Sequence, residues 1–217
     1  MKRYLFLIVL IALVFGGWQY PSWQEARQQL AVAEKRITQI VTNGTNNLDL
    51  SDLTEIRRLP SNIGEISNLK YLNVRNTNLS DLSGLEGNAT LSRLDLNNTR
   101  VVDLTPLKDM PNLQLIYLHG TWVRDISPLA TLPSLERLDI GKTQIETLQP
   151  LTRIEGLIWL NLHKSHAIDG SQEFVIALEA RPFLDLTGGT AFKQNYRPGW
   201  RYNTMLRMSR LRIQLGL

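Results

Sequence analysis

Histidine and aspartate side chains recur in this chain at spacings that could support metal binding or hydrolysis. His119 and His163 lie two periods of 22 residues apart, and so do Asp95 and Asp139. On one sheet, residues two strands apart are separated by about 9–10 Å. The two imidazoles, with Asp139 or His166 as a third ligand, could then hold a metal ion. The two carboxylates have a separation that overlaps the spacing found in inverting glycosidases.

Neither chemistry is our preferred interpretation. Two histidines on a surface are more often simple polar residues than metal ligands, and a flat exposed sheet offers neither exclusion of water nor a pocket that raises a carboxyl pKa. The chain contains no cysteine, which excludes a thiolate nucleophile, a disulfide framework and a Cys-ligated zinc site. We therefore expect no metal, no cofactor and no enzymatic activity.

The spacing of these side chains comes from an internal repeat. The pattern L-x-L-x-x-T-x-V-x-D-L-x-P-L, as in residues 94–107, recurs every 22 residues, and an earlier unit that begins at Leu48 is two residues longer. In each unit the alternating L-x-L predicts a short strand whose leucines face the core. The proline-rich half of the unit cannot form a long helix. Because one unit cannot bury its own apolar face, the units must stack.

This repeat resembles the leucine-rich repeats of bacterial proteins over roughly residues 45–170. Within that family it is similar to internalin-like surface proteins, which share the short 22-residue unit and the D-[LI]-x-P-L half. The resemblance implies an α/β solenoid, a right-handed superhelix with a parallel β-sheet on its concave face. Short 3-10 helices and turns would form the convex side. The resemblance says little about the partner.

Two polar columns follow each predicted strand. We expect the first column to lie inside the coil, where its hydroxyls would satisfy loop backbone groups from coil to coil. Its members are Thr77, Thr99, Thr121, Thr143 and Ser165. We expect the second column to cap turns, with Asp81, Asp103, Asp125 and Asp169 as its members.

The two ends of the stack need caps. Ser22-Trp-Gln-Glu25 is a capping box and predicts a helix over residues 22–42, with an apolar face from Trp23 through Ala33 and Ile37 to Ile40 or Val41. Asn43-Gly44 would end this helix. Its heptad spacing could instead form a dimer seam. Past residue 170 we expect a short helix over 171–180 and a last strand over 183–186, with Phe183, Asp185 and Thr187 continuing the sheet.

The N-terminus has the features of an export signal. Lys2 and Arg3 precede an apolar run, Tyr4–Phe15, which has the length of a signal peptide. Counted through Tyr20, the run is a short membrane span with Trp18 and Tyr20 at the headgroup level. An uncleaved signal anchor would leave a single-pass membrane protein with the repeats on the exported side. A cleaved signal would leave a secreted or periplasmic protein.

Composition and charge narrow the function further. A chain with 43% hydrophobic and 20% charged residues is too apolar to be disordered. All 20 acidic residues lie between Glu25 and Asp185, and the segment beyond Asp185 is basic. Since the repeats themselves are acidic overall, we expect no nucleic-acid-binding surface on them. The predicted segments are 1–20 (signal peptide or signal anchor), 21–46 (helical cap), 47–170 (repeats), 171–190 (C-terminal cap) and 191–217 (basic tail).

The candidate site is the concave face. The residues before, between and after the two leucines of each strand point away from the core, and six or seven strands give a face about 30 Å long. That size suits a protein or peptide rather than a small molecule. The predicted contact residues are Tyr71, Asn73, Arg75, Arg93, Asp95, Asn97, Tyr117, His119, Trp122, Arg137, Asp139, Trp159, Asn161 and His163.

Arginine and large aromatic residues are the usual anchors of such interfaces. The sequence therefore predicts an exported or membrane-anchored protein that binds a protein partner through its concave sheet. The alternative is a structural or assembly factor of the cell envelope that acts through the N-terminal helix and the basic tail.

Overall fold

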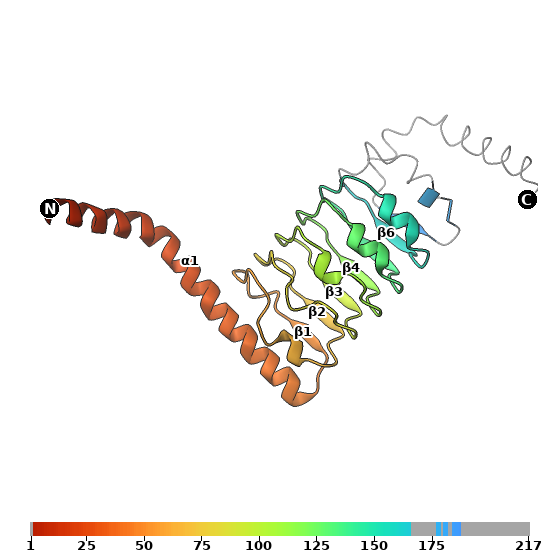
Figure 1. The fold of residues 1–217 in the computed structure, drawn as a ribbon, viewed down its shortest axis with the longest axis horizontal. Helices are drawn as coiled ribbons and strands as arrows, with labels where there is room; N and C mark the ends of the chain where they lie inside the picture. The colour runs from red at the N-terminus through yellow and green to blue at the C-terminus, as the bar shows by residue number, and fades with distance from the viewer. Residues whose placement is uncertain (1, 166–176, 179, 182–183, 188–217) are drawn as a thin grey trace, which may run out of the picture.

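The computed structural model describes residues 2–165, 177–178, 180–181 and 184–187, with side chains from Trp23 onward. Within these residues the chain forms one long helix followed by a solenoid (Figure 1). Seven described strands lie side by side in chain order, and each neighbouring pair is parallel. They are β1 (Asn47–Asp49), β2 (Tyr71–Asn73), β3 (Arg93–Asp95), β4 (Leu115–Tyr117), β5 (Arg137–Asp139), β6 (Trp159–Asn161) and β7 (Asp185–Thr187).

The convex side carries short 3-10 helices. Three of them have a proline in their first turn, where the missing N–H would have had no partner in the helix. The same prolines cannot extend a helix from its interior, so each piece stays short. These elements are η1 (Ile63–Glu65), η2 (Thr105–Leu107), η3 (Ser127–Thr131) and η4 (Gln149–Arg153). The predicted leucine-rich repeat solenoid is confirmed.

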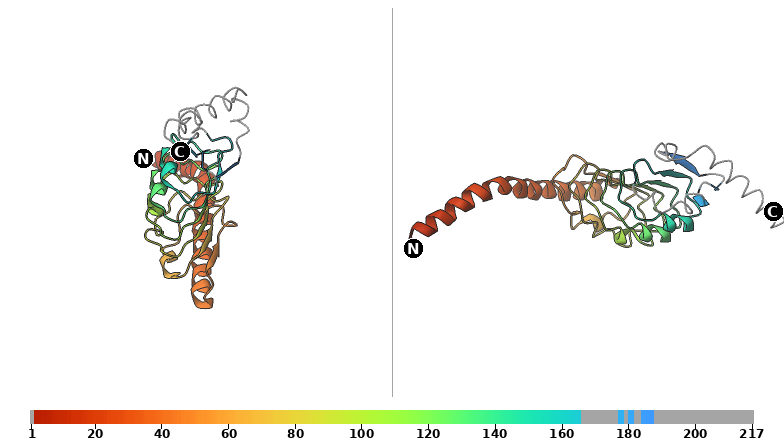
Figure 2. Two further views of the ribbon diagram at one scale, coloured as in Figure 1. Left: turned by 90° about the vertical axis from the view of Figure 1, so that its right-hand side faces the viewer. Right: turned by 90° about the horizontal axis from the view of Figure 1, so that it is seen from above.

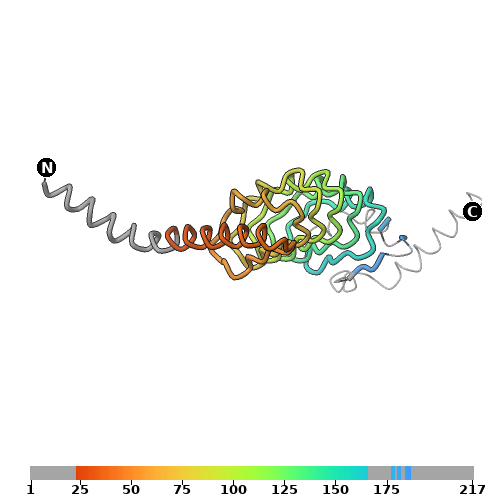
Figure 3. The backbone as a smooth tube through the Cα atoms, turned by 90° about the horizontal axis from the view of Figure 1, so that it is seen from below, coloured from red at the N-terminus to blue at the C-terminus, as the bar shows by residue number. Residues whose placement is uncertain are grey.

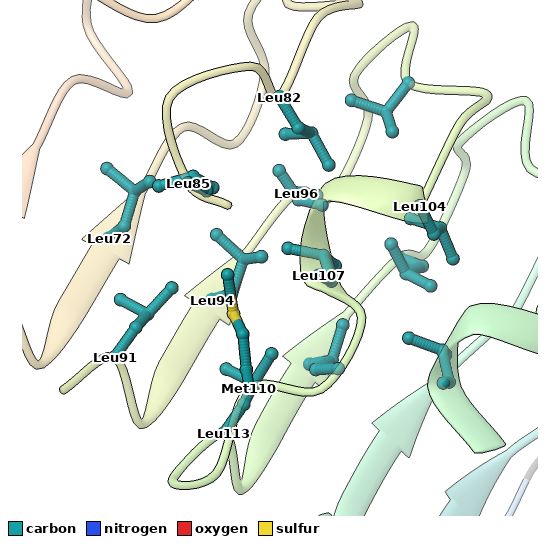
Figure 4. Packing of buried hydrophobic residues seen from close by; sticks show 14 of the residues in the cluster. Leu72, Leu82, Leu85, Leu91, Leu94, Leu96, Leu104, Leu107, Met110 and Leu113 are labelled. Carbon is teal, nitrogen blue, oxygen red and sulfur yellow. The ribbon is translucent and has the colours of Figure 1, made fainter. Parts of the chain in front are cut away.

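Leucines fill the space between the sheet and the convex side. Leu72 of β2 and Leu94 of β3 are fully buried, as are Leu85 and Leu107 from the opposite side of the coils. Figure 4 shows these side chains packed together in successive coils. Burying one such leucine is worth about 1.5–3 kcal/mol relative to leaving it exposed. Each coil therefore depends on its neighbours to complete the core.

The threonine and serine column lies inside the coils, as predicted, but its hydrogen bonds differ from those expected. Each threonine hydroxyl donates to a carbonyl three residues earlier in its own coil rather than to the next coil. The bonds run from Thr77 to Val74 (2.7 Å), Thr99 to Leu96 (2.8 Å), Thr121 to Leu118 (2.7 Å) and Thr143 to Ile140 (2.6 Å). Among the described residues, the pair Thr143 and Ser165, 3.3 Å apart, is the link between hydroxyls of adjacent coils.

Helix α1 (Lys2–Asn43) covers the N-terminal end of the stack (Figures 2 and 3). The prediction that it begins at Ser22 is wrong, because the helix continues through Ser22 from Lys2. A capping box marks where a helix can begin, but the preceding leucine- and alanine-containing run also favours a helix. The helix ends as predicted, with Gly44 at φ +66° after Asn43. In the described part of the chain, no helix is long and apolar enough to cross a membrane.

The packing face of α1 is shorter than predicted. Ala33 and Ile37 are buried against the first coil, and Ile40, one of the two residues predicted for the end of the face, packs partly buried against the core. Trp23, expected at the start of the face, is 63% exposed. Arg36 fixes the helix to the coil through two bonds of 2.6 Å to the carboxylate of Asp52. Those bonds lower the pKa of Asp52 below its ordinary value. The guanidinium of Arg57, in the first coil, lies over the ring of Trp23.

The last described strand is displaced by two residues from its predicted position. Leu186 of β7 pairs with Leu160 of β6, whereas we expected Leu184 in that place. A shift of two residues keeps the same side chains facing the core, and both leucines pack against it. Asp185 therefore lies beside Trp159, the place predicted for Phe183, and Thr187 lies beside Asn161.

The C-terminal end has a cap that the sequence did not reveal. The guanidinium of Arg181 donates to the carbonyls of Leu151, Thr152 and Ile154 at the end of η4. Helix ends leave such carbonyls without partners inside the helix. Phe183, His166, Asp169, most of the helix predicted at 171–180 and the tail at 191–217 lie outside the described residues.

Candidate protein-binding surface

The strand registers bring the predicted contact residues together in three columns. The first column runs along the strands through Tyr71, Arg93, Leu115, Arg137 and Trp159. The second contains Asp49, Asn73, Asp95, Tyr117, Asp139 and Asn161, which we call the strand-end column because each member is the last residue of its strand. The third, two residues further along each coil, contains Arg75, Asn97, His119, Gly141 and His163.

The strand-end column is less accessible than predicted. Asn73 and Asp95 are only 4% and 6% exposed, so the expectation that these two side chains are exposed on the concave face is wrong. Asp139 and Asn161 are half-buried. Aspartate and asparagine are short, and the charges of Arg75 and Arg93 lie close enough to act on the carboxylate of Asp95. Burial accordingly raises the pKa of Asp95 above its ordinary value.

The short polar members of the strand-end column cap their own strands. Each accepts a hydrogen bond from the backbone N–H two residues later, the local pattern that Asp and Asn side chains favour. The donors and acceptors are Ser51 to Asp49 (2.9 Å), Arg75 to Asn73 (3.2 Å), Asn97 to Asp95 (3.1 Å), Gly141 to Asp139 (2.9 Å) and His163 to Asn161 (3.0 Å). These side chains therefore stabilise the coil before any partner is considered.

Tyr117 is the exception in this column, since its ring cannot accept such a bond. The N–H of His119, which an aspartate at position 117 would have bound, donates instead to Oδ1 of Asn97 in the preceding coil at 2.8 Å. Asn97 is thus a structural substitute that releases position 117 for a large aromatic side chain. The sequence signal was the one tyrosine among the Asp and Asn residues of this column.

Arg93 joins two tyrosines into a stacked cluster on the concave face. Its guanidinium carbon lies 4.7 Å from the ring centre of Tyr71 and 5.3 Å from that of Tyr117. Burial raises the pKa of Tyr71, with Arg93 opposing the shift. Cation–π contacts of this kind hold an arginine in one orientation. We call Tyr71, Arg93 and Tyr117 the aromatic–arginine cluster.

The charged groups of this face are unequally satisfied. The carboxylates of Asp49, Asp95 and Asp139 all accept hydrogen bonds. The guanidinium groups of Arg75, Arg93 and Arg137, in contrast, form no hydrogen bond or ion pair with any residue that the structure describes. The charged groups of this face that keep unused hydrogen-bonding capacity among the described residues are therefore these guanidinium groups, of which Arg75 and Arg93 also act on the charge of Asp95.

His119 leans towards Asp139 over a glycine. Its Nδ1 lies 3.6 Å from Oδ1 of Asp139, and a Cβ atom on Gly141 would come within 2.5 Å of that nitrogen. Glycine is thus the residue that leaves room for the imidazole. Among the described residues no group of three histidine, aspartate or glutamate side chains could hold a metal ion. His166, one of the suggested third ligands, lies outside them.

The carboxylates suggested for hydrolysis are engaged in capping. Asp95 accepts the N–H of Asn97, and Asp139 accepts both the N–H of Gly141 and Nδ2 of Asn161. Contrary to the expectation for an exposed sheet, burial on this sheet does raise the pKa of one carboxyl group, that of Asp95.

Aspartates also cap the turns on the other side of the coils, as predicted. Ser83, Thr105 and Ser127 donate their backbone N–H groups to the carboxylates of Asp81, Asp103 and Asp125, respectively. Hydrogen bonds from Ser83 and Thr105 lower the pKa of Asp81 and Asp103. We call these three aspartates the turn column.

The stacked coils, the parallel concave sheet and the repeated caps define a leucine-rich repeat fold. A family model described as "Leucine Rich repeats (2 copies)" matches residues 111–153. No curated protein gives a significant match to the chain.

Among solved structures the repeats are similar to internalins of Listeria monocytogenes. Internalin C2 is 26% identical with a TM-score of 0.51, and the match covers 66% of this chain and 70% of internalin C2. The internalin InlF is 27% identical with a TM-score of 0.47, and the match covers 54% of this chain and 37% of InlF. This chain therefore spans little more than a third of the length of InlF. The expected internalin-like character of the repeats is confirmed.

Proposed function

We propose that this protein binds a protein partner through its concave face, with the aromatic–arginine cluster at the centre of the contact. The single observation that carries this proposal is the stacking of Arg93 between Tyr71 and Tyr117. Tyrosine and arginine dominate the energetics of protein interfaces. A solenoid sheet is also the extended concave surface that repeat proteins use for binding.

The rigidity of the cluster supports this role. Each member sits on a strand that is hydrogen-bonded on both sides, and the stack holds Arg93 in place. A surface that is ordered before binding loses less conformational entropy when the partner arrives. Trp159, half-buried in the same column, and exposed Trp122 extend the apolar area available for contact.

The charge of the face indicates the chemistry of the partner. Because the carboxylates accept capping hydrogen bonds while Arg75, Arg93 and Arg137 form no hydrogen bond or ion pair with a described residue, the partner should present acidic side chains to these arginines. A carboxylate can bind a guanidinium through two parallel bonds. We therefore expect the arginines and aromatic residues to contact the partner directly. The buried Asn73 and Asp95 would contribute by stabilising the strand ends that carry these residues.

We also propose that the repeats act outside the cytoplasm. The charged Lys2 and Arg3 followed by the apolar run Tyr4–Phe15 support export, with the segment either retained as a tether or cleaved. Protease accessibility of the repeats in intact cells, together with the N-terminal sequence of the mature protein, tests this point. Repeats that are digested only after lysis of the inner membrane would contradict it.

The test of the binding site is an in-cell crosslink and pull-down of the tagged full chain. The variant Arg93→Ala/Tyr117→Ala should bind the captured partner at least about 30-fold more weakly, as expected for loss of hot-spot residues. Arg153→Ala, which removes one exposed arginine in η4, is the matched control and should bind like the wild type. Thermal melts verify that all variants fold.

Equal capture by the wild type and the double variant would refute the concave site. It would favour the alternative in which the N-terminal helix and the basic tail make the contacts of an assembly factor. Deletion of the tail at 191–217 would then be the next variant.

A further inference from the structure

A second surface lies at the opposite end of the stack from β7, between α1 and the first coil. The structure has a groove of about 670 Å³ there, whose floor includes Leu30 and Ile56 and whose rim includes Trp23, Arg27, Arg57 and Arg58. The concave face does not contribute to it. The predicted apolar face of the helix did not suggest a groove, because Trp23 was expected to be packed against the core.

The groove combines an apolar floor with a positive rim. Trp23 is the most exposed of the large hydrophobic side chains in the described part of the chain, at 63%. The guanidinium carbon of Arg57 lies 4.8 Å from the centre of its ring. The side chains of Arg27, Arg57 and Arg58 form no hydrogen bond or ion pair with any described residue.

The acidic groups nearby form no ion pair with this rim among the described residues. Asp81 lies next to Arg58 in a backbone bridge and feels its charge, but the carboxylate accepts its hydrogen bonds from Ser83. Glu55 accepts a bond from Asn78 through Oε2. Three arginines and a tryptophan therefore face the solvent together, a combination that suits an anionic amphiphile.

The position of the groove along α1 indicates which kind of anionic amphiphile it would bind. Trp23 follows Tyr20, the end of the N-terminal apolar segment, by three residues, or about 4.5 Å along the helix. If residues 4–20 enter a bilayer, Trp23 and the arginines lie at the depth of the headgroups, where tryptophan is enriched and basic residues attract anionic lipids.

We propose that the groove formed by Trp23, Arg27, Arg57 and Arg58 binds the headgroups of anionic phospholipids and so orients the repeats relative to the membrane. This inference rests on the membrane tether proposed above. Indole and aliphatic side chains cover the upper acyl region and the arginines bind the phosphates. The concave face is left free for its protein partner, since it lies on the sheet and not at the helical end.

The chain contains no cysteine, so a single fluorescent reporter can be placed in the groove. We would label Gln24→Cys with an environment-sensitive dye and reconstitute the full chain in bilayers of phosphatidylcholine with rising phosphatidylglycerol content. The dye should become more intense as phosphatidylglycerol increases. A dye on Glu155→Cys, an exposed residue in the last described coil, should not respond.

Two charge-loss variants make the test specific. Arg57→Gln/Arg58→Gln should lose the response to phosphatidylglycerol, because each arginine contributes about fivefold to binding at an anionic surface. Arg100→Gln/Arg153→Gln removes the same charge from exposed positions elsewhere and should keep the response. Circular dichroism verifies folding of both.

The outcomes separate the groove from the tether. Flotation of the chain with vesicles, made either of phosphatidylcholine alone or with phosphatidylglycerol, tests the tether. If the chain floats with both vesicles but the dye does not respond to phosphatidylglycerol, the groove proposal is overturned and the tether stands. The same holds if the dye response survives in Arg57→Gln/Arg58→Gln. A chain that floats with neither vesicle overturns both. A dye that responds to soluble poly-glutamate and not to phosphatidylglycerol overturns the lipid in favour of an acidic peptide.

Discussion

The turn column and the strand-end column use one local device in two different surroundings. Asp103 in a turn and Asp95 at a strand end each accept the backbone N–H of the residue two positions later. Yet the pKa of Asp103 is lowered, whereas that of Asp95 is raised. Asp103 is exposed and keeps only the benefit of its hydrogen bonds, while Asp95 is 6% exposed and loses the hydration of its charge.

The opposite pKa shifts of Asp103 and Asp95 reflect the different roles of the two columns. An exposed aspartate stabilises its turn at little cost in hydration, so the turn column is purely local. A buried acid carries a cost that asparagine avoids, and two of the six strand-end residues are asparagine. Tyr117 cannot accept this hydrogen bond, and the side chain of Asn97 in the preceding coil accepts it instead. The side chains of the concave surface thus vary from coil to coil. In every coil from the one with Ser51 to the one with His163, the backbone N–H two residues after the strand end still has a side-chain acceptor.

The largest expected effect comes from removing the most connected member of the strand-end column. Asp139→Ala leaves the N–H of Gly141 and Nδ2 of Asn161 without an acceptor and removes the contact to His119. We expect the free energy of unfolding to fall by about 2–3 kcal/mol in urea denaturation. Asp139→Asn keeps an acceptor and should lose less. If the urea midpoint of Asp139→Ala equals that of the wild type, the strand-end column does not stabilise the strand ends.

The substitute cap predicts a coupling between two coils. Asn97→Ala should cost about 1–2 kcal/mol, because the N–H of His119 loses its acceptor. In a Tyr117→Asp background the new carboxylate can accept that N–H, so Asn97→Ala should cost much less. A double-mutant cycle in urea measures the coupling. Additive effects would contradict the idea that Asn97 substitutes for position 117.

The turn column should give a smaller loss with a defined pH dependence. Asp103→Ala should cost about 0.5–1 kcal/mol at neutral pH, since its hydrogen bond is exposed to solvent. The lowered pKa of Asp103 means that its contribution is present above the ordinary aspartate pKa and is lost as the pH falls through the folded pKa. Urea midpoints of the two proteins should therefore converge in acid. A difference that persists at the lowest pH would oppose this explanation.

The smallest expected effect has the opposite sign. The pKa of Asp95 is raised in the folded protein, so its contribution to stability is greatest below the ordinary aspartate pKa and declines as the pH rises through the folded pKa. Asp95→Asn removes the buried charge and keeps an acceptor for Asn97. The variant should melt slightly higher than the wild type at neutral pH and equally in acid. A lower melting temperature at neutral pH would indicate that the charge itself is needed.

The repeating part of the fold was predictable because its determinants are local. The leucines of L-x-L, the hydroxyl at the Thr99 position and the aspartate at the Asp103 position recur at short, fixed offsets within each unit. The hydroxyl and the aspartate bond within their own coil, and the leucines repeat so regularly that stacking one unit on the next buries them all. The end of α1 at Asn43 was predictable for the same reason, since the positive φ that Gly44 adopts next to it ends the helix.

The errors occurred where a local signal allowed two outcomes. Ser22 could begin a helix or lie inside one, and the helix-favouring residues before it decided the matter. Leu184 and Leu186 could each pair with Leu160, since a two-residue shift keeps the same face inward. For β7 the two registers differ by contacts that no short window of sequence contains.

The sequence by itself determined the 22-residue coil, its buried leucines, its internal hydroxyls and its turn caps, because backbone geometry and hydrogen bonds within one coil require those residue types. Only the tertiary structure decided that Asp95 is buried, that Arg93 is stacked between Tyr71 and Tyr117, and that Trp23 borders a groove with Arg57. These properties arise between residues about one repeat or more apart, where burial and charge depend on which side chains the stacking places beside each other.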